Sequence, residues 1–154
     1  ALVPAAVTVP ADNTIDEADV VRLVATVDAG TSVSFVATGA IKLVAALDNP
    51  AAVRVRSTDG VSAVVVATGT GSTATVYAYT TSVAAGTVTV SNGGVTNTIY
   101  MKGTAGAANI VSVVAPSAVA SGTVATYTFT AVDVFGNKVS GLVIAATVAG
   151  ATVA

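Results

Sequence analysis

Apolar β-branched or aromatic residues alternate with small polar residues along most of this chain, and Gly, Asn-Gly and Asp-Gly interrupt the alternation. The clearest segment runs from Thr73 to Thr81. Successive side chains of a β-strand point to opposite faces of the sheet. The segment therefore predicts two faces, with Ala74, Val76 and Ala78 on one and Thr75, Tyr77 and Tyr79 on the other.

Similar alternation predicts further strands at residues 33–38, 41–47, 53–56, 61–67, 87–91, 95–102, 109–114, 124–132 and 142–148. Turn residues separate several of them, at Asp59-Gly60, at 69–71 and at Asn92-Gly93-Gly94. Short strands at this spacing are typical of immunoglobulin-like β-sandwiches. We therefore predict an all-β fold.

One segment allows two interpretations. Residues 14–17 read Thr-Ile-Asp-Glu, which matches a helix capping box, and the Val-rich run at 20–27 could line one face of a helix. Valine loses side-chain freedom in a helix, however, and fits a strand better. A strand is the favoured interpretation, and a short helical turn that leads into a strand would satisfy both signals.

The length of the chain indicates more than one domain. Its 154 residues exceed one immunoglobulin-like sandwich of about 100 residues and fall short of two. A Gly-rich stretch at 102–106 separates two series of strands. We therefore predict tandem immunoglobulin-like β-sandwich domains, with one at 1–104 and a second, incomplete one at 105–154, and we expect the natural protein to continue beyond Ala154.

Composition excludes several classes of function. Charged residues make up only 9% of the chain and the net charge is −2, so the clustered Lys and Arg of a nucleic-acid binder are missing. Polar residues interrupt every apolar run before the ~20 residues that a membrane-spanning helix requires. The sequence therefore predicts neither nucleic-acid binding nor a membrane span.

Catalytic residues are also scarce. The chain has no His and no Cys, which excludes Ser-His-Asp triads, Cys-His pairs and thiolate or imidazole metal sites within it. Lys42, Lys102 and Lys138 lack the Ser-x-x-Lys spacing. Glu17 has only loop aspartates around it, unlike the carboxylate pair of a glycosidase. We therefore expect a protein that is not an enzyme.

One acidic cluster precedes the first long strands, and its members are Asp12, Asp16, Glu17 and Asp19. Calcium prefers hard oxygen ligands of this kind, so calcium is the one cofactor that the sequence suggests. The Asp-x-Asp-x-Asp-Gly spacing of a calcium loop is absent. A solvated acidic loop is therefore the alternative interpretation.

The stretch from Gly122 to Gly141 reads GTVATYTFTAVDVFGNKVSG. It resembles bacterial immunoglobulin-like repeats of the invasin and intimin type, in which a strand ends in Asp, a Gly-Asn turn follows, and a hydrophobic residue and Gly open the next strand. The matching residues are Asp133, Gly136, Asn137, Val139 and Gly141, whereas Lys138 stands where such repeats often carry Pro. Surface-layer proteins and adhesins contain these repeats, so the resemblance implies an extracellular setting at the cell surface.

The chemistry of this motif predicts a tight strand reversal. Asn and Gly tolerate positive φ, and the carboxylate of Asp133 can accept backbone N–H bonds within the turn. A structural turn is therefore favoured over a ligand site.

These observations lead to one expectation about function and two alternatives. We expect a surface-layer lattice subunit that acts by self-assembly, with cell-wall components as further partners. The first alternative is an adhesin stalk, whose repeats space a distal tip from the cell. The second is a filament subunit in which residues 1–10 complete the sheet of a neighbour, although a strand in the chain's own sandwich is simpler.

Overall fold

The computed structural model describes residues 4–16, 18–44, 53–54, 60, 62–67 and 71–145. All regular structure in this part of the chain is β. The strands are β1 Ala5–Thr8, β2 Thr14–Ile15, β3 Val21–Thr26, β4 Ser32–Gly39, β5 Ile41–Val44, β6 Val53–Arg54, β7 Ser62–Val66, β8 Thr73–Thr80, β9 Ala85–Asn92, β10 Val95–Thr104, β11 Ile110–Val114 and β12 Thr128–Val132. No helix that could cross a membrane occurs among the described residues.

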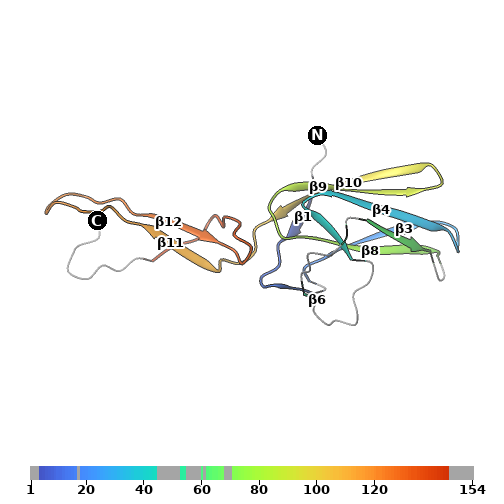
Figure 1. Ribbon diagram of the computed structural model, residues 1–154, viewed down its shortest axis with the longest axis horizontal. Helices are drawn as coiled ribbons and strands as arrows, with labels where there is room; N and C mark the ends of the chain where they lie inside the picture. Colours follow the sequence, from blue (N-terminus) through green and yellow to red (C-terminus); the bar gives the residue numbers. More distant parts are fainter. Residues whose placement is uncertain are drawn as a thin grey trace.

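Two sheets form the body of the molecule. One has five strands in the order β1-β10-β9-β4-β7, and the other has three in the order β3-β8-β5. β1 pairs with β10 in parallel, and the other pairings within these two sheets are antiparallel. The short pair β2-β6 lies beside them, while the pair β11-β12 extends away from one end (Figure 1). We call the body at residues 4–104 the sandwich and residues 107–145 the arm.

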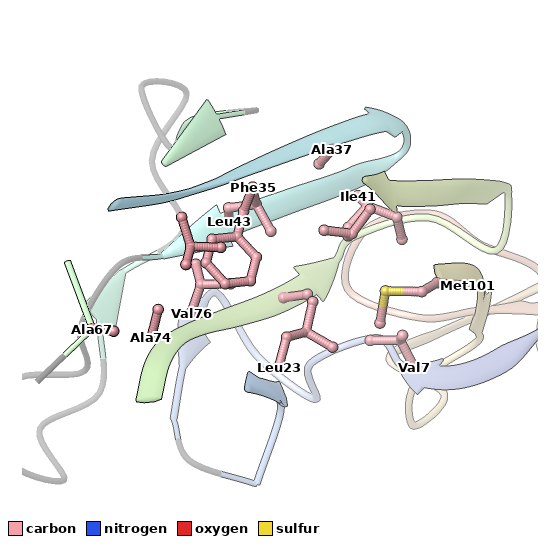
Figure 2. Close-up of a cluster of buried hydrophobic side chains, with 13 residues drawn as sticks. Val7, Leu23, Phe35, Ala37, Ile41, Leu43, Ala67, Ala74, Val76 and Met101 are labelled. Carbon is pink, nitrogen blue, oxygen red and sulfur yellow. The ribbon is translucent and has the colours of Figure 1, made fainter. Parts of the chain in front are cut away.

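The core lies between the two large sheets (Figure 2). Alternate residues of β4 are buried, as the period of two requires, and they meet alternate residues of β8 from the opposite sheet. The buried cluster consists of Val7, Leu23, Val33, Phe35, Ala37, Ile41, Leu43, Ala67, Ala74, Val76, Ala78, Val88 and Met101. Phe35 is the only aromatic side chain in this cluster. Most of the core is therefore built from small aliphatic side chains.

The turn between β9 and β10 illustrates how local chemistry sets the register. Asn92 pairs with Val95, which leaves a loop of two residues, Gly93 and Gly94. Their φ angles are +56° and +92°, as a type I′ turn requires at both central positions, and the twist of such a turn matches that of the two strands. Glycine adopts such angles without steric cost. The turn predicted here from the sequence is confirmed.

The all-β prediction is confirmed, and so is the sandwich packing of the body. The tandem immunoglobulin-like arrangement and the boundary between 104 and 105 stay predictions, although β10 does end at Thr104. In the ambiguous segment, β3 forms at Val21–Thr26 and a backbone bond from Asp19 N to Asp16 O closes a turn before it. The strand interpretation is therefore the right one for this segment.

Two expectations about strands need correction. Residues 124–127 and 142–145 lie outside any strand, although both segments were predicted as parts of strands. The reason is the same each time, because alternation identifies residues that can pair or pack, whereas the presence of a partner depends on tertiary structure.

Some predictions fall outside the described residues. They concern residues 45–47, 55–56, 61, 146–148, Asp59 and the two residues 69–70.

Phe35→Ala should cost about 3–5 kcal/mol in the free energy of unfolding, because it removes a fully buried aromatic ring from a cluster whose other side chains are mostly too small to fill the cavity. Urea denaturation monitored by circular dichroism would measure the change. Thr96→Ala, on an exposed position of β10, is the control and should change stability by less than about 0.5 kcal/mol. Equal stability of the two variants would contradict this description of the core.

Candidate functional site

The residues with the most specific polar contacts lie where the arm meets the sandwich. β10 ends at Thr104, and the connection to β11 begins with Ala105 and Gly106. The turn after β12, at residues 133–137, returns to this point and contacts the loop between β8 and β9. Three segments that are distant in the sequence therefore meet at one junction.

Asp133 is the centre of this junction and is only 1% exposed. Its Oδ1 accepts hydrogen bonds from the backbone N–H groups of Phe135, at 3.0 Å, and Asn137, at 2.9 Å. Its Oδ2 accepts a bond from the backbone N–H of Gly106, at 3.2 Å. The N–H of Asp133 donates to the carbonyl of Asn137 at 2.9 Å, and that of Gly136 donates to the carbonyl of Asp133 at 3.0 Å. The predicted strand reversal is thus present, and its carboxylate also holds the connection to the sandwich.

Asn137 makes the contact across the junction. Its Nδ2 donates to the carbonyl of Thr81 at 2.9 Å, and its Oδ1 accepts from the N–H of Val83 at 3.3 Å. Nδ2 also donates to Oδ2 of Asp133 at 3.0 Å. This role was missed in the sequence analysis, because a turn alone explains an Asn after Gly and no local signal points to a loop so far back in the chain.

The loop that receives Asn137 has a fixed shape of its own. Thr80 is fully buried, and its Oγ1 accepts from the N–H of Ser82 at 3.1 Å. The same hydroxyl lies 3.0 Å from the carbonyls of Ala40 and Ser82 and can donate to either. A Cβ on Gly103 would lie 1.9 Å from the carbonyl oxygen of Ser82, so only glycine allows β10 to approach the loop this closely.

Two opposing effects act on the ionisation of Asp133. Burial favours the neutral form and raises its pKa. Hydrogen bonds from the side chain and backbone of Asn137 and from the N–H groups of Gly106 and Phe135 favour the anion, and their sum lowers the pKa below its ordinary value of 3.8. The ionised carboxylate is thus part of the folded structure.

An open groove of about 570 Å³ runs beside the junction. Pro4, Ala6 and Lys102 line it from the sandwich, and Lys138 and Ser140 line it from the arm. Both lysines are exposed. Its described lining contains no carboxylate that could act as a general acid or base.

The acidic loop uses its carboxylates to cap its own backbone. Asp12 accepts from the N–H of Thr14 at 2.8 Å and from the hydroxyl of the same residue. Asp16 accepts from the N–H of Ala18 at 2.8 Å, and Asp19 accepts from the N–H of Asp16 at 3.1 Å. These contacts match the solvated-loop interpretation, although Glu17 lies outside the described residues.

The pKa values of two carboxyl groups in this loop move in opposite directions. The hydrogen bonds from Thr14 lower the pKa of Asp12. Partial burial raises the pKa of Asp19, and the nearby charges of Asp16 and Asp12 raise it further. The part of the chain that the structure describes contains no group of three acidic side chains placed to hold a metal ion. Calcium binding stays a prediction.

Comparison with known proteins returned no similar protein. No family model matches the sequence, and no curated protein and no solved structure matches it either. The resemblance to invasin-type and intimin-type repeats therefore rests on the residues between Gly122 and Gly141 alone.

The lowered pKa of Asp133 predicts how stability depends on pH. Because the folded-state pKa lies below the unfolded value of about 3.8, the carboxylate contributes its full stabilisation above that pH and loses it as the pH falls through the folded pKa. Asp133→Asn should remove this dependence. It should also cost about 1–3 kcal/mol at pH 7, because an NH2 group would face N–H donors.

Urea denaturation between pH 2 and pH 7 would measure both effects. Asp28→Asn, at an exposed loop position, is the matched control and should leave the curve unchanged. A variant Asp133→Asn with the stability and pH profile of the parent would contradict the role of this carboxylate.

The calcium prediction is tested by thermal unfolding with calcium and with a chelator. Bound calcium should raise the melting temperature. At a calcium concentration a hundredfold above Kd, the free energy of unfolding should increase by about 2.7 kcal/mol. The triple variant Asp12→Asn, Asp16→Asn, Asp19→Asn should lose the response, and Asp28→Asn should keep it. If the chelator leaves the melting temperature of the parent protein unchanged, the prediction of calcium binding is wrong.

Proposed function

We propose that this chain is a structural segment of an extracellular surface assembly, with a surface-layer lattice as the leading form, and that it acts by self-association. The observation that carries this proposal is the arm, which presents apolar strands with free edges and almost no charge.

In the part of the chain that the structure describes, the arm consists of two paired strands that no further layer covers. β11 and β12 pair in antiparallel register from Ile110 opposite Val132 to Val114 opposite Thr128. Every residue of β11 is exposed, including Val114 at 69%. Large apolar side chains are exposed on both strands and next to them: Ile110, Val111, Val113, Val124, Tyr127 and Phe129. A two-stranded sheet is marginally stable in water by itself, so further burial would stabilise it considerably.

The edges of the arm also lack protection against pairing. Within the described residues neither β11 nor β12 has a second partner strand, and an isolated bridge joins Val132 to Lys138. Between Gly106 and Ala145 the only charged residues are Asp133, which is buried, and Lys138. Monomeric proteins usually protect sheet edges with charges or Pro, and an edge without them can add a strand from another chain.

The sandwich offers a second surface on which another copy of the chain could pack. The outer side of the five-stranded sheet carries mainly hydroxyl side chains, and two pairs of them are hydrogen bonded to each other, Thr38 with Thr87 and Thr89 with Thr98. A polar face with few charges causes little electrostatic repulsion when two copies pack together. Lateral contacts between sandwiches and strand addition at the arm would together extend a lattice.

The two alternatives draw on different observations. An adhesin stalk requires a stiff connection between units, and the bonds from Asn137 to Thr81 and Val83 favour it. A filament that donates residues 1–10 to a neighbour is less favoured, because β1 already pairs with β10 of its own sheet.

Thr128→Lys tests the self-association proposal. The residue is exposed on β12, so the charge should leave the fold intact while blocking strand addition next to it. Sedimentation velocity over a range of concentrations should show the parent as oligomers and the variant as a monomer. Thr26→Lys, exposed on β3 of the three-stranded sheet, is the control for added charge and should associate like the parent. A parent that stays monomeric at high concentration, or a variant that associates equally well, would contradict the proposal.

A further inference from the structure

We propose that the loop Thr80–Ala84 is a docking surface for the turn Asp133–Asn137, and that Asn137 acts as a clamp that fixes the direction of the arm relative to the sandwich. The hydrogen bonds of Asp133 and Asn137 would then both shape the turn and connect the arm to the sandwich. The proposal concerns one molecule and does not rest on self-association.

The side-chain amide of Asn137 imitates a residue of a neighbouring strand. In a parallel ladder, one residue donates its N–H to a carbonyl of the adjacent strand and accepts with its C=O from the N–H two residues further on. Nδ2 and Oδ1 of Asn137 make this pair of bonds to the carbonyl of Thr81 and the N–H of Val83. The geometry is specific to a primary amide, because a carboxylate has no donor and a hydroxyl cannot span both groups.

Both surfaces are held in place by contacts within their own part of the chain. On the arm, Asp133 binds the backbone N–H and the Nδ2 of Asn137, so the side chain is oriented before it meets the loop. On the sandwich, buried Thr80 binds the N–H of Ser82, and Gly103 allows β10 to lie against the same loop. Contacts between preorganised groups lose little conformational entropy when they form.

The connection between the two parts would otherwise be a flexible hinge. Residues 105–109 form no regular structure and include Gly106. Oδ2 of Asp133 binds the N–H of Gly106, so the same carboxylate that orients Asn137 also fixes this connection. The connection, the turn and the loop are thus held by one carboxylate and one amide, which converts a hinge into a rigid joint.

Asn137→Ala tests the clamp, and the amide of Val83 is its direct reporter. That N–H donates to Oδ1 of Asn137, so its hydrogen exchange should become about tenfold faster in the variant. Residual dipolar couplings of dilute protein should fit one alignment tensor for sandwich and arm in the parent and two different tensors in the variant. Asn97→Ala, on an exposed position of β10, is the matched control and should behave like the parent.

Further measurements guard against a variant that simply loses the arm structure. Cross-strand contacts between β11 and β12 in Asn137→Ala should persist, since Asn137 belongs to neither strand. In the unaltered protein, the side-chain amide protons of Asn137 should exchange slowly. Rapid exchange of these protons, or one shared tensor and unchanged Val83 exchange in Asn137→Ala, would overturn the proposal.

Asn137→Asp separates the amide from the size of the side chain. It replaces the donor with a second carboxylate next to Asp133 and should open the joint at pH 7 at least as far as Asn137→Ala. A variant Asn137→Asp that keeps the parent's alignment would also contradict the clamp.

Discussion

The arrangement of this molecule depends on the buried carboxylate of Asp133. It accepts hydrogen bonds from the turn that contains it, from the connection at Gly106 and from the side chain of Asn137. A buried anion without these donors would be costly, and the donors without the anion would be unsatisfied. The group is therefore stable only when turn, connection and side chain are in place together, and this mutual dependence couples the arm to the sandwich.

The two parts of the chain are stabilised by different interactions. The sandwich has a continuous apolar core of small side chains around Phe35, and its longer strands pair in two sheets. The arm exposes its apolar side chains, and Ala131 is its only buried hydrophobic residue among those described. Polar contacts at Asp133 and Asn137 thus give the arm a direction without giving it a core. This combination, a directed but uncovered apolar sheet, is what makes association with another copy the favoured proposal.

Local chemistry allowed much of the fold to be predicted from the sequence. Alternation identified β4, β8, β9 and β10, and the glycines at 93 and 94 identified the turn between the last two. Prediction failed at 124–127 and 142–145, where alternating residues have no strand to pair with. The turn at Asp133 was predictable because its bonds lie within five residues, whereas the contact from Asn137 to Thr81 depends on how two distant segments meet.

The distance between the two parts tests the rigid joint most directly, and the chain suits the measurement because it has no native Cys. Spin labels attached through Thr96→Cys on the sandwich and Ser117→Cys on the arm, both at exposed positions, would report that distance by pulsed electron paramagnetic resonance. A rigid junction predicts one narrow distance distribution in the dilute protein, which broadens when Asn137→Ala is added. A distribution that is equally broad with and without Asn137 would contradict the account.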